Sequence, residues 1–262
     1  MMLRIEDLRF SYKDKPVLDG VDLEIRPGEV IGIIGPNGCG KTTLLKHLNR
    51  NLRPAVGRVL LDDRDIEKMT KSDIARYVAV VPQSNEIHFS FTVRDIVTMG
   101  RMPFLEKFSG ESSDDLRKID EAMEKTNIRE FADRFINTMS GGERQRVIIA
   151  RALAQTPEII LLDEPTLHLD ISNQFDVLDL VRKLSVEDGL TVVIVSHDLP
   201  MAVRYCDRLV MLKDHKIFAA GTPEEVLTPE NIREIFNVDA VFEKDPVTEQ
   251  NTVRIYGSCT KR

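Results

Sequence analysis

Gly35-Pro36-Asn37-Gly38-Cys39-Gly40-Lys41-Thr42 matches every fixed position of the sequence pattern GxxxxGK[ST]. The apolar run Val30–Ile34 before this stretch predicts a buried strand, and Thr43–Leu48 after it predicts a helix. Between a strand and a helix, the glycines let consecutive backbone N–H groups turn inward around phosphate oxygens, at the positive end of the helix. The alternative is a glycine-rich turn that binds no ligand.

The same pattern assigns roles within this phosphate loop. The Lys41 ammonium is expected to reach the β- and γ-phosphates of a nucleotide, and the Thr42 hydroxyl to hold Mg²⁺. Cys39 stands at a variable position of the loop, and we expect it to be a small structural residue. The alternative is an oxidisable cysteine, because a helix start can lower the pKa of a thiol. The expected nucleotide-binding residues are Gly35, Pro36, Asn37, Gly38, Cys39, Gly40, Lys41, Thr42 and Thr43.

The amino-acid composition excludes several classes of protein. The 262 residues are 42% hydrophobic and 30% charged, enough for a substantial core in one large or two smaller domains. The net charge of −7 disfavours a nucleic-acid partner, and three cysteines without a CxxC spacing argue against zinc or disulfides. No apolar run approaches the roughly 20 residues that span a bilayer, and no secretory signal is visible. The chain is therefore expected to stay in the cytosol.

Hydrophobic periodicity divides the chain into four parts. Residues 1–84 carry period-two strand signals and the first part of a P-loop ATPase core, and residues 85–156 carry helical periodicity instead. Residues 157–238 return to alternating strands and helices, the second part of the core, and residues 239–262 form a C-terminal tail. The predicted fold class is α/β: a P-loop NTPase core with an antiparallel β subdomain and an inserted α-helical subdomain.

Individual elements follow from the same periodicity and from turn and capping residues. In the inserted part, Leu116, Ile119 and Met123 share one helical face behind the capping candidates Ser112 and Ser113. The expected strands are Arg4–Phe10, Val21–Ile25, Arg58–Leu61, Tyr77–Val81, Ile159–Leu162, Val192–Val195, Arg208–Leu212 and Lys216–Ala220, with turns at Pro27-Gly28 and Asp62–Asp65 and helix starts at Thr222 and Thr228. The tail is expected to hold a short strand pair, with Val253, Ile255 and Tyr256 on its last segment.

Two carboxylates end the apolar run Ile159–Leu162. The carboxyl ends of buried parallel strands are where α/β proteins bind ligands, and in P-loop NTPases a strand-end aspartate helps to hold Mg²⁺. Asp163 is the candidate for this ligand, and Glu164 is placed to orient or deprotonate an attacking water. The alternative is that Asp163 caps a helix.

Ser140-Gly141-Gly142-Glu143 precedes a helical segment. Ser140 and Glu143 have the spacing of a capping box, which alone predicts the start of an ordinary helix. A capped helix start with two glycines also allows close approach of a partner and binds anions. Both interpretations hold together.

Five motifs in one order give the chain a family resemblance: the phosphate loop, Gln83 after a strand, Ser140-Gly141-Gly142, the strand ending Asp163-Glu164-Pro165-Thr166, and Ser196-His197-Asp198. This order resembles the nucleotide-binding subunit of ABC transporters over nearly the whole chain. The resemblance implies Mg²⁺-dependent ATP hydrolysis by a head-to-tail homodimer that sandwiches two ATP molecules. The signature segment departs from the family pattern at Met139 and Glu143, where leucine and glutamine are commoner, and little harm is expected.

The resemblance carries roles over to single residues. Tyr12 would stack on adenine, and the alternative is an aromatic residue at a strand end. Gln83 would contact Mg²⁺ and the attacking water, and His197 would donate a hydrogen bond to the γ-phosphate, although a histidine after a strand is more often structural. Ser140 and Gly142 would bind the γ-phosphate held by the other subunit, and Gly141 and Glu143 of the same segment are also expected to be nucleotide-binding residues. Leu169-Asp170 would form the loop that crosses the dimer interface.

A narrower resemblance concerns three linker segments, Met99–Pro103, Leu169–Gln174 and Ala220–Leu227. They are similar to the subunits of importers for iron-siderophore, haem and cobalamin. Such importers pair this subunit with polytopic membrane permease subunits and, indirectly, an external substrate-binding protein, which implies a peripheral place on the cytoplasmic face of the membrane. The alternative is an ABC ATPase of another import system. A chromosome or DNA-repair ATPase would carry long heptad arms, and no insertion in this sequence is long enough for them. A soluble translation-type ABC protein usually fuses two cassettes, whereas this sequence has one phosphate loop and one signature segment.

The surface that receives the permease is expected between Gln83 and Phe108. The apolar side chains in this stretch are Phe89, Phe91, Met99, Met102, Phe104 and Phe108. Methionine and phenylalanine suit an adaptable groove that docks a short helix. The alternative is that they form the core of the helical subdomain, and each interpretation can hold for different residues.

Overall fold

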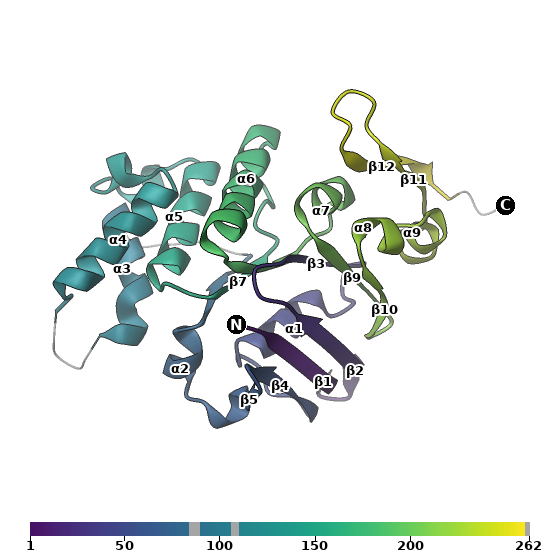
Figure 1. The fold of residues 1–262 in the computed structure, drawn as a ribbon, viewed down its shortest axis with the longest axis horizontal. Coiled ribbons are helices and arrows are strands. Elements are labelled where there is room, and N and C mark those ends of the chain that lie inside the picture. The colour runs from purple at the N-terminus through teal and green to yellow at the C-terminus, as the bar shows by residue number, and fades with distance from the viewer. Residues whose placement is uncertain (84–89, 106–109, 260–262) are drawn as a thin grey trace. The chain divides into compact units, whose positions relative to one another are not determined.

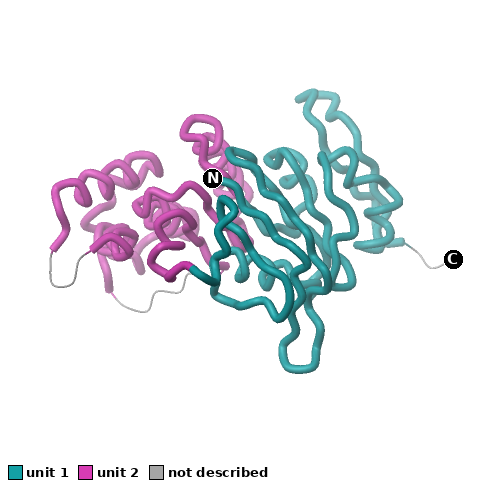
Figure 2. Tube along the Cα trace, turned by 60° about the horizontal axis from the view of Figure 1, so that its bottom comes forward, with its two compact units in different colours: residues 1–68, 193–262 teal, residues 69–192 magenta. Residues whose placement is uncertain are grey.

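The computed structural model describes residues 1–83, 90–105 and 110–259. The chain divides into two compact units: residues 1–68 with 193–262 form unit 1, and residues 69–192 form unit 2 (Figure 2). The expected four-part division of the sequence stays a prediction beside these two units. No described helix is both long and apolar enough to cross a membrane.

An antiparallel sheet of four strands occupies the N-terminal part of unit 1 (Figure 1). Its order is β2-β1-β4-β5, and the strands are β1 (Leu3–Tyr12), β2 (Lys15–Ile25), β4 (Val56–Leu61) and β5 (Arg64–Asp65). The prediction of antiparallel strands here is confirmed, and the hairpin turn is narrower than expected, at Asp62-Asp63 alone. Leu3, Ile5 and Leu8 are buried on one face of β1, as period-two spacing requires until a bulge shifts the register.

The second sheet contains the parallel strands that position the phosphate loop. Its strand order is β10-β9-β3-β8-β7-β6, and the boundary between the two units falls inside β8. The strands are β3 (Val30–Ile34), β6 (Val78–Val81), β7 (Ile159–Asp163), β8 (Thr191–Val195), β9 (Arg208–Lys213) and β10 (Lys216–Gly221). Every residue of β3, β7 and β8 is buried, which confirms the prediction made from continuous apolar runs.

Helices in unit 1 follow the strands at the predicted starts. The phosphate loop leads into α1 (Lys41–Leu48), and Thr222 and Thr228 cap the helices that follow β10. The remaining elements of this unit are η1 (Ile66–Lys68), α7 (Leu199–Tyr205), α8 (Pro223–Val226), α9 (Pro229–Phe236) and the hairpin of β11 (Val238–Lys244) and β12 (Asn251–Ser258). The hairpin confirms the strand pair expected in the tail.

Unit 2 is mainly helical between β6 and β7, as expected from its periodicity. Its helices are α2 (Lys71–Ala75), α3 (Val93–Thr98), η2 (Met99–Phe104), α4 (Ser113–Lys125), η3 (Arg129–Phe131), η4 (Ile136–Thr138), α5 (Gly141–Ala154) and α6 (Ile171–Asp188). Ser112 caps α4 as predicted, and Ile119 and Met123 of the expected helical face are buried, whereas Leu116 is 48% exposed. The buried positions of α4 are Asp115, Ile119, Ala122 and Met123.

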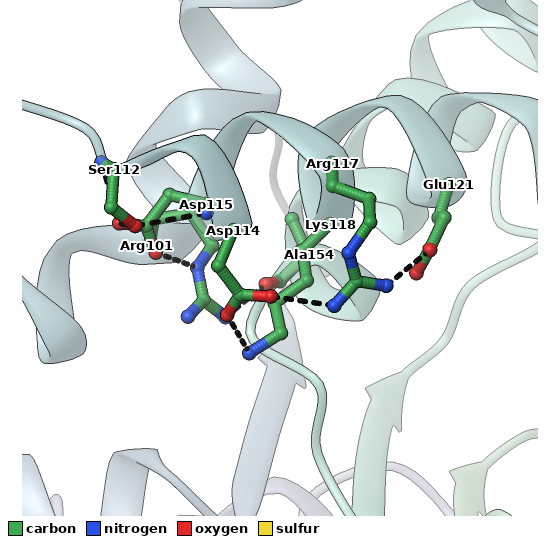
Figure 3. A network of polar contacts seen from close by, with 8 residues as sticks. All are labelled: Arg101, Ser112, Asp114, Asp115, Arg117, Lys118, Glu121 and Ala154. Carbon is green, nitrogen blue, oxygen red and sulfur yellow. Dashed lines mark hydrogen bonds and ion pairs between the residues drawn. The ribbon is translucent and has the colours of Figure 1, made fainter.

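Asp115 takes the place of an apolar residue because it pairs with the buried Arg101 (Figure 3). The Arg101 Nε donates to Asp115 Oδ1 at 2.8 Å, and Nη1 donates to the Ala154 carbonyl at 2.7 Å. The Ser112 hydroxyl and then Arg101 donate hydrogen bonds to the Asp115 carboxylate and lower its pKa from 3.8 to about 2. One guanidinium therefore joins η2, α4 and the end of α5.

Candidate functional site

The phosphate loop of unit 1 has the backbone conformation that the motif requires. Gly35, Gly38 and Gly40 have φ of 147°, 81° and 108°, in the region that L side chains rarely adopt. A Cβ on Gly35 would lie 2.4 Å from the Leu212 carbonyl oxygen, so a side chain is excluded there by space as well. The loop is therefore built by glycine at the positions where only glycine fits.

Lys41 lies folded back over this loop. Its side chain is 6% exposed, and Nζ donates to the Gly35 carbonyl at 2.8 Å and to the Pro36 carbonyl at 3.1 Å. Both acceptors are neutral carbonyl oxygens, and the first turn of α1 carries no acidic side chain. A phosphate group would supply the negative charge that complements this ammonium and the helix N-terminus. The arrangement fits the triphosphate of a nucleotide.

Cys39 is 7% exposed within the loop. Burial raises the pKa of its thiol, which disfavours the thiolate and with it the alternative of a low-pKa, oxidisable cysteine. Its Sγ lies 2.9 Å from the point that a Cβ on Gly35 would occupy. The thiol fills space under the loop, as the structural interpretation expects.

Tyr12 and His197 are the other predicted site residues of unit 1. Tyr12 is the last residue of β1, its side chain is 45% exposed, and its ring packs edge-to-face on Phe10. His197 follows β8 in an exposed bend, so it is not a core histidine. The neighbouring Ser196 Oγ accepts from the Asp198 backbone N–H at 3.0 Å, and Asp198 in turn caps α7. Serine and aspartate thus fix the backbone on both sides of His197.

In unit 2 the strand-end carboxylates and the glutamine come together. Asp163 is the last residue of β7 and is 7% exposed. Gln83 follows the neighbouring parallel strand β6, and its Nε2 donates to Glu164 Oε2 at 3.0 Å. The next helix, α6, begins at Ile171, so the alternative that Asp163 caps a helix is wrong.

The signature segment is the capped start of α5. The Ser140 N–H donates to Glu143 Oε2 at 2.7 Å, and the Glu143 N–H donates to Ser140 Oγ at 3.3 Å, so the predicted capping box is confirmed. Hydrogen bonding of the Glu143 carboxylate to the Ser140 backbone N–H, and then to the Ser140 side chain, lowers the pKa of Glu143. Both contacts leave the helix N-terminus at Gly141 and Gly142 with a fixed geometry.

Asn173, a residue that sequence analysis missed, connects this segment with Asp170. A Cβ on Gly142 would lie 2.1 Å from Asn173 Oδ1. The Asn173 Nδ2 donates to both carboxylate oxygens of Asp170 at 2.9 Å, and Asp170 caps α6 through the Asn173 N–H. Gly142 and Asp170 therefore share one neighbour within unit 2.

The donor set suits magnesium. A Thr42 hydroxyl, a Gln83 amide oxygen and an Asp163 carboxylate are hard oxygen ligands, the kind that Mg²⁺ takes alongside phosphate oxygens. Because the Gln83 amide nitrogen donates to Glu164, the acceptor oxygen is the atom of that amide available for a cation. The residues present therefore fit this ion.

A phosphate loop between a buried strand and a helix, with carboxylates at the end of a parallel strand, defines a P-loop nucleotide-binding protein. The model of the ABC transporter family matches residues 18–167, more than half of the chain. The chain belongs to the ABC transporter family.

Individual relatives agree with this assignment. The hemin import ATP-binding protein HmuV of Rhodococcus jostii is 45% identical over 226 residues, which cover 86% of this chain and 76% of that protein. The cobalamin import ATP-binding protein BtuD of Halobacterium salinarum is 42% identical over 87% of this chain. The match spans 57% of that relative, little more than half of its length.

Solved structures share the fold. A metal-chelate type ABC transporter in an inward-facing conformation has a TM-score of 0.85 at 29% identity, covering 97% of this chain and 96% of that chain. The dimeric bacterial ABC transporter cassette MJ0796 has a TM-score of 0.73 at 31% identity, covering 84% of this chain and 98% of that chain. The α/β fold class, with its antiparallel sheet and inserted helices, is thereby confirmed.

Proposed function

We propose that this chain is the ATP-hydrolysing, nucleotide-binding subunit of an ABC importer that energises uptake of a metal chelate: an iron-siderophore, haem or cobalamin. The observation that carries the ATPase part is the hydrogen bond between Gln83 and Glu164 at the ends of two parallel strands. This bond fixes the Glu164 carboxylate at the end of β7, which supports its role as the base that activates water. The hemin and cobalamin import relatives support the class of cargo.

Hydrolysis then proceeds in one displacement. Lys41 binds the β- and γ-phosphates, and Tyr12 stacks on the adenine. Glu164 accepts a proton from water as the water oxygen attacks the γ-phosphorus, while Gln83 orients the attacking water and the Glu164 carboxylate. The bond from the γ-phosphorus to the bridging oxygen breaks, and ADP leaves with those electrons. His197 donates a hydrogen bond to the γ-phosphate and stabilises its developing charge.

Mg²⁺, when bound, would be held by Thr42, Gln83 and Asp163 and would neutralise charge on the phosphate oxygens. The chain's own contribution is to exclude bulk water and to fix the base. We place Ser140 and Gly142 against the γ-phosphate bound by the partner subunit, with Gly141 and Glu143 in the same capped helix start, and Asp170 in the loop that crosses the interface. The proposal thus includes a homodimer that sandwiches two ATP molecules; the dimeric cassette of similar fold supports it.

We place the permease contact on the apolar residues of η2 and on Phe91, which precedes α3. Met102 is 67% exposed, whereas Phe91, Met99 and Phe104 are half-buried. Phe104 packs under the Arg101 guanidinium, whose central carbon lies 3.9 Å from the ring centroid. Phe89 and Phe108 lie outside the described residues. Met102 is therefore the side chain offered to a partner, and Phe104 supports it.

The decisive experiment is reconstitution with the permease and its loaded external binding protein. ATP hydrolysis by the isolated chain should be indifferent to haem, cobalamin or ferric siderophores, because ligand choice resides in the other subunits. The hydrolysis rate of the reconstituted complex should rise with the loaded binding protein. A complex that couples to export, without a binding protein, would contradict the importer part and leave the ATPase part standing.

A surface variant tests the permease contact separately. Met102→Glu should abolish the rise in rate on reconstitution while basal hydrolysis stays within about twofold of wild type, since exposed substitutions perturb folding little. Leu116→Glu is the matched control, because Leu116 is an apolar residue of the same unit with 48% exposure. Equal stimulation of all three proteins would remove Met102 from the interface.

A further inference from the structure

Tyr12 stands at the tip of a hairpin, where a strand alone orients a side chain poorly. Its backbone partner in β2 is Lys15, so the turn Lys13-Asp14 follows at once. The ring is 45% exposed and packs on Phe10, two residues earlier on the same strand. The two ring centroids are 4.9 Å apart with an interplanar angle of 89°, an edge-to-face pair.

Phe10 is held in turn by His47 of α1. These rings are also edge-to-face, with centroids 4.8 Å apart at 72°. His47 is fully buried, and its Nδ1 lies 2.8 Å from the Thr43 carbonyl oxygen, one turn earlier in the same helix. That acceptor makes Nδ1 the donor and fixes the orientation of the ring, and burial lowers the pKa of the imidazole, which favours its neutral form. The three rings form a continuous aromatic row from α1 to Tyr12.

The same helix carries the phosphate-binding residues. Lys41 opens α1 and His47 lies near its end, six positions on, which corresponds to about 9 Å along a helix. A second contact fixes the hairpin at the other end: a Cβ on Gly40 would lie 2.8 Å from the Val17 carbonyl oxygen and 3.0 Å from Leu18. Leu18 is the register partner of Phe10 in β2.

The β1–β2 hairpin is thus packed against both ends of the phosphate helix. One contact, at Gly40, is backbone against backbone and sets the distance between the hairpin and the phosphate loop. The other, at His47, is the aromatic row that ends at Tyr12. Two separated contacts restrict the pivoting of the hairpin that either contact alone would allow. The hairpin therefore holds Tyr12 at a set place relative to Lys41.

We propose that Phe10, wedged between His47 and Tyr12, is a positioning residue that fixes the adenine-stacking ring relative to the phosphate helix. This inference rests on the proposed function, since it requires Tyr12 to stack on the base. A phenylalanine that merely packs the hairpin would affect every ligand of the phosphate loop alike. A positioning residue affects only ligands that carry a base.

The test compares two probes on the full chain by calorimetric titration: ATP, and inorganic tripolyphosphate, which has no base. Phe10→Leu should weaken ATP binding roughly threefold to tenfold, the scale of one aromatic pair, and leave tripolyphosphate binding unchanged. Phe10→Tyr keeps the ring and should bind ATP like wild type. Tyr12→Ala should weaken ATP binding about tenfold or more, since base stacking on an aromatic ring contributes that much.

The outcomes separate the two proposals. If Tyr12→Ala weakens ATP binding but Phe10→Leu does not, the positioning role is wrong and base stacking stands. If Tyr12→Ala changes nothing, base stacking is wrong and the positioning role goes with it. Equal loss of both probes in Phe10→Leu would mean a general packing role. Should Phe10→Leu fail to fold, His47→Gln, which retains a donor toward Thr43, should show the same selective loss of ATP binding.

Discussion

Gly142 and Asn173 are so close that a methyl group on the glycine would lie 2.1 Å from the asparagine Oδ1. Asn173 also binds the Asp170 carboxylate through its Nδ2. The start of the signature helix α5 and the capped start of α6 are therefore packed through a single amide. Any displacement of Asn173 moves both segments that we assign to the dimer interface.

Gly142→Ala should accordingly lower both the stability of the chain and its ATP hydrolysis. We expect a loss of about 1–3 kcal/mol in the free energy of unfolding, the cost of overpacking a close contact, together with at least a tenfold loss of hydrolysis. Gly141→Ala is the matched control for stability, because the nearest atom to its Cβ is Leu169 Cδ2 at an ordinary 3.4 Å. Urea denaturation and steady-state hydrolysis measure the two effects.

The double variant Gly142→Ala with Asn173→Ala identifies the cause. Truncating Asn173 removes the two atoms nearest the new methyl group, so stability should return in part, and the two substitutions should not be additive. Hydrolysis should stay low, because Asn173→Ala removes the amide that holds the Asp170 carboxylate. Additive destabilisation would show that the close contact is not what Gly142 serves.

Glu164→Gln tests the base. The variant keeps the size of the side chain but cannot accept a proton, so hydrolysis should fall at least ~100-fold, the usual scale of general-base catalysis, while MgATP still binds. A stable ATP-bound dimer should then accumulate and be visible by gel filtration. Normal turnover would assign the base elsewhere. Glu158→Gln is a control that changes an acidic residue at the opposite end of β7.

Ser140 separates capping from nucleotide contact. Ser140→Arg places bulk and charge where we expect the partner's γ-phosphate, so nucleotide should still bind to the monomer, whereas ATP-driven dimerisation and hydrolysis are lost. Ser140→Asp caps a helix as well as serine does, and the fold should therefore be unchanged. The aspartate carboxylate would add a negative charge facing the negatively charged γ-phosphate and should therefore abolish hydrolysis. An active Ser140→Asp variant would reduce Ser140 to a helix cap.

Much of the fold was predictable because local rules act over short stretches. Period-two runs, continuous apolar runs and capping residues gave the strands and the helix starts, including those at Ser112, Ser140 and Thr222. Leu116 is exposed although it shares a helical face with Ile119 and Met123, because a polar residue, Asp115, occupies the buried position instead. Only its distant partner Arg101 makes that burial possible, and no local pattern shows such a pair.

The candidate site also contains some residues that local sequence patterns predict and others that they do not. The phosphate loop follows from a motif whose mechanism is local, since glycine dihedral angles and a helix start suffice to build it. Gln83 depended entirely on the family resemblance, and its bond to Glu164 joins segments distant in sequence. Phe10, His47 and Asn173 were missed because an alternating aromatic residue, a buried histidine and a helical asparagine each have ordinary structural explanations.

The last prediction concerns the buried ion pair of unit 2 and its dependence on pH. The Arg101 and Asp115 side chains are 2% and 10% exposed, so Asp115→Asn leaves a buried guanidinium without its counter-charge. We expect a loss of roughly 2–3 kcal/mol in the free energy of unfolding at pH 7, by urea denaturation. Asp114→Asn, one residue earlier and with its side chain 53% exposed, is the control and should change little.

The lowered pKa of Asp115 determines how the stability lost in Asp115→Asn depends on pH. Its folded value of about 2 lies below the ordinary 3.8, so the ionised carboxylate stabilises the fold above about pH 4. The contribution shrinks as pH falls below about 4 and is gone once the folded pKa of about 2 is passed. Wild type and Asp115→Asn should therefore converge in stability as the pH falls from about 4 to about 2, whereas a constant difference would mean that the carboxylate charge plays no part.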